Sequence, residues 1–310
     1  MRDRKGIFFG IAKLFDKRRK SAKQSRKAKG AGLQSYAPLP EFASQPPSDR
    51  YIEKIFRLPL NEAKCTLSVV SMSGNVIISG YESDVVCMKV MYRPKNSDAD
   101  IVFADDGSGQ YSLNYGANDF DSVWAEAHVP VRAFAKIHMS TKNGKILVKN
   151  ISTRQLHVSG QGCELKNVFA NVLRVENTQN NLYLTSITSL HGDIDLSGGS
   201  LSAIGMDIKE LSISVTEGSA DIDAKYDRHD NYSWSVESKS SGMLDFNLPY
   251  GPSYYVLAQT RSGSVRMARR DMDILAGNAL FIEAKNKGYD EALKKVNLQV
   301  EAPRGSIVIN

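Results

Sequence analysis

The chain of 310 residues is 42% apolar and 24% charged, a composition that excludes an intrinsically disordered polymer. No stretch of about eighteen apolar residues occurs, so a transmembrane helix is excluded as well. The net charge of +6 is unevenly distributed, because residues 1–30 contain twelve Lys or Arg against two Asp. The rest of the chain is therefore slightly acidic, which argues against nucleic-acid binding by the folded part.

Residues 1–32 form a basic segment with the pattern of an amphipathic helix. Apolar residues at positions 7, 8, 11, 14 and 15 share one helical face, and cations flank that face. On an anionic membrane each cation near the surface contributes about 1 kcal/mol, and phenylalanines insert shallowly. The residues predicted to contact the membrane are Lys5, Phe8, Phe9, Ile11, Phe15, Lys17, Arg18, Arg19 and Lys20.

Other interpretations of this basic segment stay open. A mitochondrial transit peptide is also basic and amphipathic, although Asp3, Asp16 and the excess of Lys over Arg count against it. A solvated tail, or a helix docked on the protein itself, fits the same composition. Nucleic-acid binding by the segment needs only cations, since it is driven by counterion release. A secretory signal is not predicted, because the short apolar core is broken by Lys13 and precedes the densest cations.

Residues 33–50 read as a linker. They contain four prolines with Ser and Gln between them, a composition that prevents a continuous helix or a central strand. The folded domain is therefore expected to span residues 51–310.

Within that domain the chain repeats a pattern of apolar strand, glycine turn and second strand. Copies occur at 67–78, 137–148, 156–165, 173–184, 191–196, 211–222, 234–246, 256–267 and 296–309. Marker glycines from Gly192 to Gly263 are spaced by 26, 24 and 21 residues, and a period in the twenties is typical of stacked repeats. Each unit is too short to bury its apolar face alone. The sequence therefore predicts an all-β fold, a β-solenoid of stacked coils with glycine corners.

Two sections interrupt this rhythm. Residues 79–132 contain longer apolar runs and predict a β-rich cap that protects the first coil. Residues 268–295 predict an excursion with a short helix at 290–295. The recurrent glycines are assigned to tight turns that need φ > 0, because no phosphate-binding GxGxxG or GK[ST] motif accompanies them.

The best candidates for chemistry are outward aspartates. Asp193 and Asp195 flank one inward isoleucine, and Asp221 and Asp223 flank another in the next unit. Stacked in register, the four carboxylates would form a ladder able to hold Ca²⁺ or to act as an acid and base on a polysaccharide. The alternative is a solvated face, because like charges directly opposite each other destabilise a sheet.

Other reactive side chains do not combine into a recognisable site. The five histidines lack zinc-binding spacing, and Cys65, Cys87 and Cys163 are widely separated, as expected for buried thiols in a reducing compartment. Tyrosines near Trp234 form an aromatic concentration that closes a core or offers a carbohydrate platform. No cofactor and no catalytic residue is predicted.

The units Ser-Gly-Asn-Val, Asn-Gly-Lys-Ile, His-Gly-Asp-Ile and Ser-Gly-Ser-Val resemble those of the bacterial putative-adhesin family of β-solenoid domains of unknown function. The resemblance covers residues 60–310. It implies a stacked β-solenoid and a role at or near the cell envelope, with no established chemistry.

The sequence as a whole favours a non-enzymatic scaffold, attached peripherally to an anionic membrane through its basic head. The solenoid would then engage a protein partner or a second copy, on the cytoplasmic side. Two rival hypotheses remain. One is a carbohydrate-binding or carbohydrate-active β-helix that uses the aspartate ladder, and the other is a mitochondrial protein whose basic head is removed after import.

Overall fold

The computed structural model describes residues 42, 50–60 and 65–310, so the predicted membrane-contacting segment and nearly all of the linker lie outside the described residues. The described part contains twenty-one strands and one short 3₁₀ helix. The strands are β1 (Ile52–Pro59), β2 (Cys65–Ser73), β3 (Val76–Tyr81), β4 (Val85–Pro94), β5 (Val102–Asp105), β6 (Gln110–Asn114), β7 (Phe120–Pro130), β8 (Phe134–Asn143), β9 (Lys145–Gly160), β10 (Gly162–Asn177), β11 (Leu182–Leu196), β12 (Leu201–Val215), β13 (Ala220–Ala224), β14 (Asn231–Ser238), β15 (Met243–Asn247), β16 (Ser253–Gln259), β17 (Ser264–Met267), β18 (Met272–Asn278), β19 (Phe281–Asn286), β20 (Lys295–Glu301) and β21 (Ser306–Ile309).

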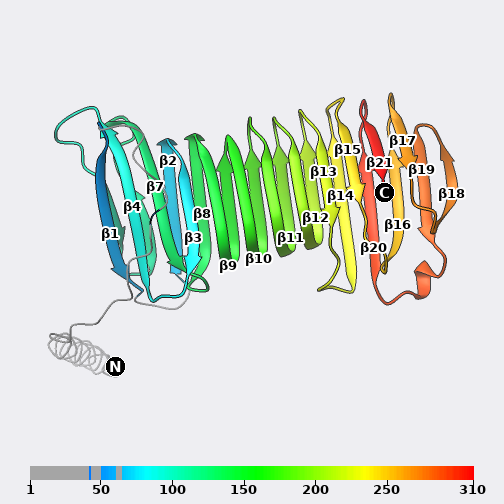
Figure 1. The fold of residues 1–310 in the computed structure, drawn as a ribbon, viewed down its shortest axis with the longest axis horizontal. Helices are drawn as coiled ribbons and strands as arrows, with labels where there is room; N and C mark the ends of the chain where they lie inside the picture. Colours follow the sequence, from blue (N-terminus) through cyan, green and yellow to red (C-terminus); the bar gives the residue numbers. More distant parts are fainter. Residues whose placement is uncertain (1–41, 43–49, 61–64) are drawn as a thin grey trace, which may run out of the picture. The chain divides into compact units, whose positions relative to one another are not determined.

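The predicted all-β solenoid is confirmed. Strands β9 to β12 run parallel and in register, each forming one coil of the stack (Figure 1). Leu182 lies beside Leu201, so one regular coil takes 19 residues. Alternate residues of each strand point inward and are buried, which places a continuous core of Ile, Val and Leu along the stack.

Each long strand bends near its middle at a residue in the left-handed region. Asn150, Asn167 and Ser186 have φ of 55°, 54° and 55°, and Gly205 continues the row at 69°. Asn tolerates this conformation better than most residues, and the Asn167 amide donates to Oδ1 of Asn150 at 3.0 Å. The chain therefore turns from one face to the next, and parallel pairing resumes beyond the bend.

A second corner is a column of glycines. Gly74 and Gly218 have φ of 137° and 116°, as predicted for tight turns, but other members of the column have a different physical cause. A Cβ on Gly144 would lie 2.1 Å from the Gly74 carbonyl oxygen, and one on Gly242 would lie 1.9 Å from that of Gly218. Neither Gly144 nor Gly242 has a positive φ. At these positions glycine is required because neighbouring coils approach closely, not because the turn is left-handed.

The first and last coils are inserted between strands that lie elsewhere in the sequence. Strand β2 lies between β6 and β8, and β3 lies between β7 and β9. At the other end β20 lies between β14 and β16, and β21 lies between β15 and β17. Antiparallel strands then finish both ends, β4 and β1 beyond β7, and β19 and β18 beyond β16 (Figure 1).

Three details of the sequence interpretation are corrected. Gly192 is not at a corner but lies buried inside β11, packed against Ile208 and Leu211. The regular coils are shorter than the marker glycines indicated. The predicted helix at 290–295 is instead a single 3₁₀ turn at Tyr289–Glu291, preceded by the β18–β19 hairpin. Among the described residues, no helix is long and apolar enough to cross a membrane.

Candidate functional site

The four candidate aspartates point outward as predicted, but they do not stack. Asp193 of β11 lies beside Arg174 and Ser212, whereas Asp221 of β13 lies beside Ser202 and Asp245. The prediction of a four-carboxylate ladder is therefore wrong. The reason is the bend within the long strands: Asp193 and Asp195 follow the bend, whereas β13 continues the column that precedes it.

A shorter carboxylate pair exists where the ladder was expected. Asp221 and Asp245 are register neighbours, and Asp223 stands beside Asn247. Burial and the Asp221 carboxylate raise the pKa of Asp245, and the Asn310 amide donates to its Oδ1 at 2.7 Å. Within the part of the chain that the structure describes, no group of three or more His, Cys, Asp or Glu is arranged to hold a metal ion.

The acidic pair on β11 has a different environment. Burial raises the pKa of Asp195, and the nearby carboxylates of Asp193 and Glu176 act in the same direction. Glu176 in turn accepts from the Arg174 guanidinium at 2.9 Å. Beyond the bend, the long strands therefore carry acidic and basic side chains side by side, and these do not form a site for a cation.

Two histidines that the sequence left unconnected lie together. His138 and His157 are register neighbours on β8 and β9, and their Nδ1 atoms are 3.1 Å apart. Burial and the neighbouring His157 lower the pKa of His138. Because an Nδ1–Nδ1 hydrogen bond needs one donor and one acceptor, the pair holds together when one of these nitrogens carries a proton and the other does not.

The three cysteines are buried, as predicted. Burial raises the pKa of Cys163 to about 12, so its thiol stays protonated and is a poor nucleophile at neutral pH. His157 comes after the bend in β9, whereas Cys163 comes before the bend in β10. The two side chains therefore lie on different faces of the solenoid.

The aromatic concentration mainly fills the core. Trp234, Tyr232 and Tyr254 are buried, and the Trp234 indole donates to the Ile208 carbonyl oxygen at 2.6 Å. Tyr250 is the exception, being 82% exposed. Its ring and that of Tyr254 both lie 4.7 Å from the Arg269 guanidinium. The buried rings therefore offer no surface for a ligand, whereas the Tyr250 ring stays exposed beside Arg269.

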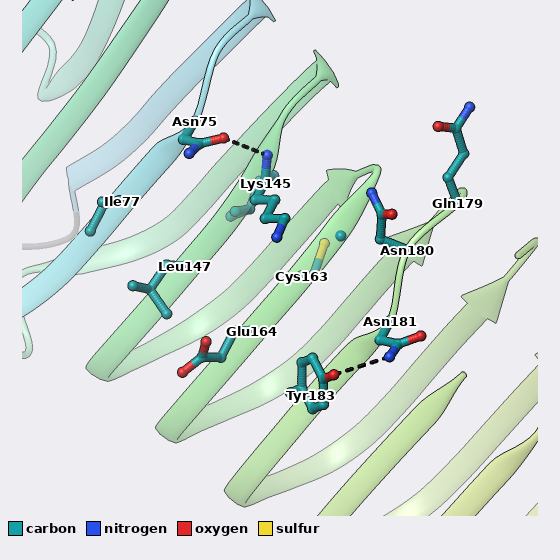
Figure 2. A pocket seen from close by; sticks show the side chains of 12 residues that line it. Asn75, Ile77, Lys145, Leu147, Cys163, Glu164, Gln179, Asn180, Asn181 and Tyr183 are labelled. Carbon is teal, nitrogen blue, oxygen red and sulfur yellow. Dashed lines mark hydrogen bonds between the residues drawn. The ribbon is translucent and has the colours of Figure 1, made fainter. Parts of the chain in front are cut away.

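A hollow with a volume of 490 Å³ lies on the outer face of β3, β9, β10 and β11 (Figure 2). It forms around Gly162, which stands beside Lys145 of the previous coil and has no side chain of its own. Figure 2 shows Lys145 on one side and the turn that carries Asn180 and Asn181 on the other. The missing side chain at Gly162 therefore opens a gap in an outward column.

Polar groups of several kinds line this hollow. Asn75 accepts from the Lys145 backbone N–H at 3.0 Å, and the Asn181 amide donates to the Tyr183 hydroxyl at 3.0 Å (Figure 2). The Tyr183 ring is 47% exposed, and Glu164 lies beside it on β10. One cation, one carboxylate, four amides and an aromatic ring suit hydrogen bonding to a polar ligand, with the ring as a stacking surface.

The family model described as Toastrack DUF4097 matches residues 53–274. The chain belongs to the Toastrack family. The β-solenoid family predicted from the glycine-containing units is thereby confirmed, and the Gly162 hollow lies within the matched region.

Several solved structures resemble this Toastrack chain. A putative adhesin from Bacteroides fragilis is 11% identical, with a TM-score of 0.47 and coverage of 86% of this chain and 100% of the other. A putative adhesin from Parabacteroides distasonis is 11% identical, with a TM-score of 0.45 and coverage of 84% and 97%. A putative cell adhesion protein from Clostridium sporogenes is 16% identical, with a TM-score of 0.29 and coverage of 84% and 98%. No curated protein matches the chain.

Sequence reasoning missed both the histidine pair and the Gly162 hollow. Each depends on which residues become neighbours one coil apart, and a one-residue error in register changes every such neighbour. The signal for the hollow was present in the sequence, because Gly162 replaces the polar residue that Lys145 and Asn181 supply in adjacent coils.

Proposed function

We propose that this Toastrack chain is a non-enzymatic interaction scaffold, held at an anionic membrane surface by its basic head and engaging a protein partner or a second copy through its solenoid. The observation that carries the proposal is the separation of charge along the chain. Residues 1–30 contain twelve Lys or Arg and two Asp, while the rest of the chain has more acidic than basic residues.

This distribution suits peripheral attachment. With each cation near an anionic surface contributing about 1 kcal/mol, the head holds enough charge for binding, and Phe8, Phe9 and Phe15 add shallow apolar insertion. The slightly acidic solenoid is repelled by the same surface and stays in solution. A polybasic anchor of this kind acts on the cytoplasmic leaflet, where anionic lipids are concentrated.

The surface of the solenoid supports a binding role over a catalytic one. The carboxylates that resembled a catalytic or metal-binding ladder lie on different faces, and the Cys163 thiol is buried and protonated. What the coils present instead is a long regular surface with shallow hollows, the kind of surface that repeat proteins use to bind partners.

Vesicle sedimentation tests the membrane step. We expect the full-length chain to sediment with vesicles of phosphatidylserine and phosphatidylcholine, and to remain in solution with phosphatidylcholine alone. Deleting residues 1–32 is expected to abolish sedimentation, and raising the salt concentration to weaken it, because exposed charges are screened. Equal sedimentation of the full-length and deleted chains would contradict the proposal.

A matched pair of variants separates charge from insertion. Replacing Lys17, Arg18, Arg19 and Lys20 by Ser removes charge only, whereas replacing Phe8, Phe9 and Phe15 by Ser removes apolar surface only. We expect the first variant to lose binding to anionic vesicles, and the second to bind weakly but with the same dependence on salt. Lys142→Ser with Lys149→Ser, on the solenoid, serves as the control.

A second candidate function is saccharide binding at the Gly162 hollow, favoured by the exposed Tyr183 ring beside amide side chains. Gly162→Ser would partly fill the gap. A Cβ there meets Asn180 Cβ at 3.1 Å, so the substitution needs only a small adjustment. A glycan array with the full-length chain checks this candidate. Signals that Gly162→Ser and Tyr183→Ala both remove support it, and an array without signal retires it.

Cleavage of the head after import into mitochondria is the remaining rival. It predicts a mature chain that begins beyond residue 30, which intact-mass spectrometry of the protein from its native cells would detect. A mass that includes residues 1–32 excludes this rival and leaves the anchor hypothesis standing.

A further inference from the structure

A shallow trough follows the bend of the coils on the face that carries Phe169. Its lining side chains come from the turn before β8, from β9 and β10, and from the loop after β13. We call it the Phe169 trough and define it by Arg132, Arg154, Phe169 and Arg228 together with Asn150, Asn167 and Asn171. The part that joins Arg132 to Arg228 has a volume of 500 Å³.

The register arranges the trough along the axis of the solenoid. Ser152, Phe169, Thr188 and Asp207 are successive neighbours on β9 to β12. Ser152 donates its backbone N–H to the Val131 carbonyl oxygen at 3.0 Å, next to Arg132. At the other end the Arg228 N–H donates to Asp207 at 3.2 Å. The row therefore begins next to Arg132 and ends next to the Arg228 backbone, and the Arg228 guanidinium lies near Phe169.

Three arginines line the trough, and two carboxylates, Asp207 and Asp227, lie near Arg228. Across residues 50–60 and 65–310, no carboxylate forms an ion pair with Arg132, Arg154 or Arg228. The nearby acids are already engaged. Asp207 is buried and accepts from the Tyr232 hydroxyl at 2.7 Å, and Asp227 pairs with Lys225 at 2.8 Å. The trough is therefore positive on a domain that is slightly acidic overall.

The apolar and amide groups add specificity to this charge. The Phe169 ring is 40% exposed, and the Arg228 guanidinium lies 5.8 Å from its centre. Asn150 and Asn167 stand at the bend, Asn171 follows it, and all three are exposed. Side-chain amides donate to and accept from peptide groups, so an extended backbone would find partners along the trough.

We propose that the Phe169 trough binds an acidic, extended peptide segment of a partner protein, with an aromatic or large aliphatic residue seated on Phe169 and carboxylates reaching the arginines. The inference rests on the proposed role as an interaction scaffold. Two strand spacings of about 4.8 Å separate Val131, next to Arg132, from Phe169, beside which the Arg228 guanidinium lies. This distance of roughly 10 Å matches about three residues of extended chain at 3.3 Å each. Guanidinium groups suit carboxylates because both can pair in a bidentate manner.

The trough fits a peptide better than a nucleic acid or a membrane. Single-stranded nucleic acid is held by a series of aromatic rings on which successive bases stack, and this trough presents one exposed ring. A membrane surface needs a convex face with exposed apolar side chains, whereas Phe169 lies within a concave, amide-rich lining. These other ligands are outcomes of the test described next.

Selection from a phage-displayed library of random dodecapeptides tests the proposal with the full-length chain. The library is first depleted on the triple variant R132A/R154A/R228A, which keeps the basic head and so removes peptides that bind the head. Selection on the wild-type chain is then expected to enrich peptides with Asp or Glu on both sides of an aromatic or large aliphatic residue. Binding of one enriched peptide is measured by fluorescence anisotropy.

Single variants locate that binding. Phe169→Ala and the pair R132A/R228A are each expected to weaken binding of the enriched peptide by about tenfold or more, which is the loss typical of a central contact. The pair K149A/K166A, which removes the same charge from neighbouring positions of β9 and β10, is expected to change binding by less than about twofold. Circular dichroism of each variant checks that the solenoid remains folded.

Three results would overturn the proposal. The first is a selection that enriches no acidic sequences. The second is peptide binding that persists when Phe169→Ala and R132A/R228A are combined. The third is displacement of the peptide by oligothymidylate to the same extent in the wild-type chain and in Phe169→Ala. Vesicle sedimentation of the same variants should be unchanged, because the head is intact. A failed trough with normal vesicle binding thus refutes this inference and leaves the membrane proposal in place.

Discussion

At the scale of single residues, the glycine corner shows how a solenoid selects its sequence. The stack brings the backbone of one coil against the carbonyl oxygen of the last, and a methyl group at Gly242 would sit 1.9 Å from the Gly218 oxygen. The sequence pattern identified the position correctly. The close approach at Gly242 was not visible from it, because contact between coils is not a local property of the chain.

We therefore expect Gly242→Ala to destabilise the protein by about 2–4 kcal/mol, since neither backbone can move without disturbing its neighbours. Gly107→Ala is the matched control. Gly107 has a positive φ of 85° but nothing within 4 Å of a Cβ, so its loss should be limited to about 1 kcal/mol of backbone strain. Urea denaturation measures both, and equal losses would contradict the close-approach explanation.

The Asp221–Asp245 pair gives a prediction that depends on pH. Burial and the neighbouring Asp221 raise the pKa of Asp245 in the folded state, so folding favours the protonated carboxyl. The folded state then loses stability as pH rises from the ordinary aspartate range through the raised pKa, and regains it on acidification.

Asp245→Asn removes this cost and should raise the urea midpoint at pH 7, with the difference shrinking as the pH falls towards 4. The control is Asp223→Asn, the next outward position, whose register neighbour is the neutral Asn247 rather than a carboxylate. It should have little effect at either pH. An Asp245→Asn midpoint below that of the wild type at pH 7 would contradict the assignment.

At the scale of elements, the most consequential arrangement is the insertion of β20 between β14 and β16. Leu298 lies between Trp234 and Val256 and is fully buried, although it is only 12 residues from the C-terminal Asn310. Strands near a chain end are ordinarily prone to fraying. Here the last strands carry neighbours on both sides, so they belong to the core.

Leu298→Ala should therefore cost about 2–5 kcal/mol, as for other buried leucines. Leu293→Ala makes the same chemical change at a side chain that is 92% exposed and should cost less than about 0.5 kcal/mol. Thermal unfolding distinguishes the two. Amide hydrogen exchange should also show β20 protected to the same degree as β12, and rapid exchange in β20 would contradict its central position.

At the scale of the whole molecule, the architecture class could be predicted and the order of its parts could not. Alternating apolar residues and recurring glycines indicated stacked β-coils because both signals are local. The insertions of β2, β3, β20 and β21 depend on pairings between distant segments, which no local pattern specifies. The same reason accounts for the misplaced aspartate ladder and for the unpredicted Phe169 trough.

The candidate sites follow the same division. That Asp193 and Asp221 point outward followed from strand alternation, and that the cysteines are buried followed from their apolar surroundings. That His138 meets His157, and that Phe169 lies between arginines from distant segments, required the exact number of residues in each coil. The bends at Asn150 and Asn167 help to set the number of residues in each coil, and the only sequence signal of each bend is one asparagine.

The inserted final coil also constrains how the protein can be made. A ribosome can release β8 to β12 in an order that lets each coil stack on the one before it. Strands β16 and β17, however, leave the ribosome before β20 and β21, the coil on which they must stack, has been synthesised. The C-terminal end of the solenoid can therefore be completed only after β20 and β21 have left the ribosome. A chain that stops before residue 295 would display open strand edges, and those edges would mark it for degradation or aggregation.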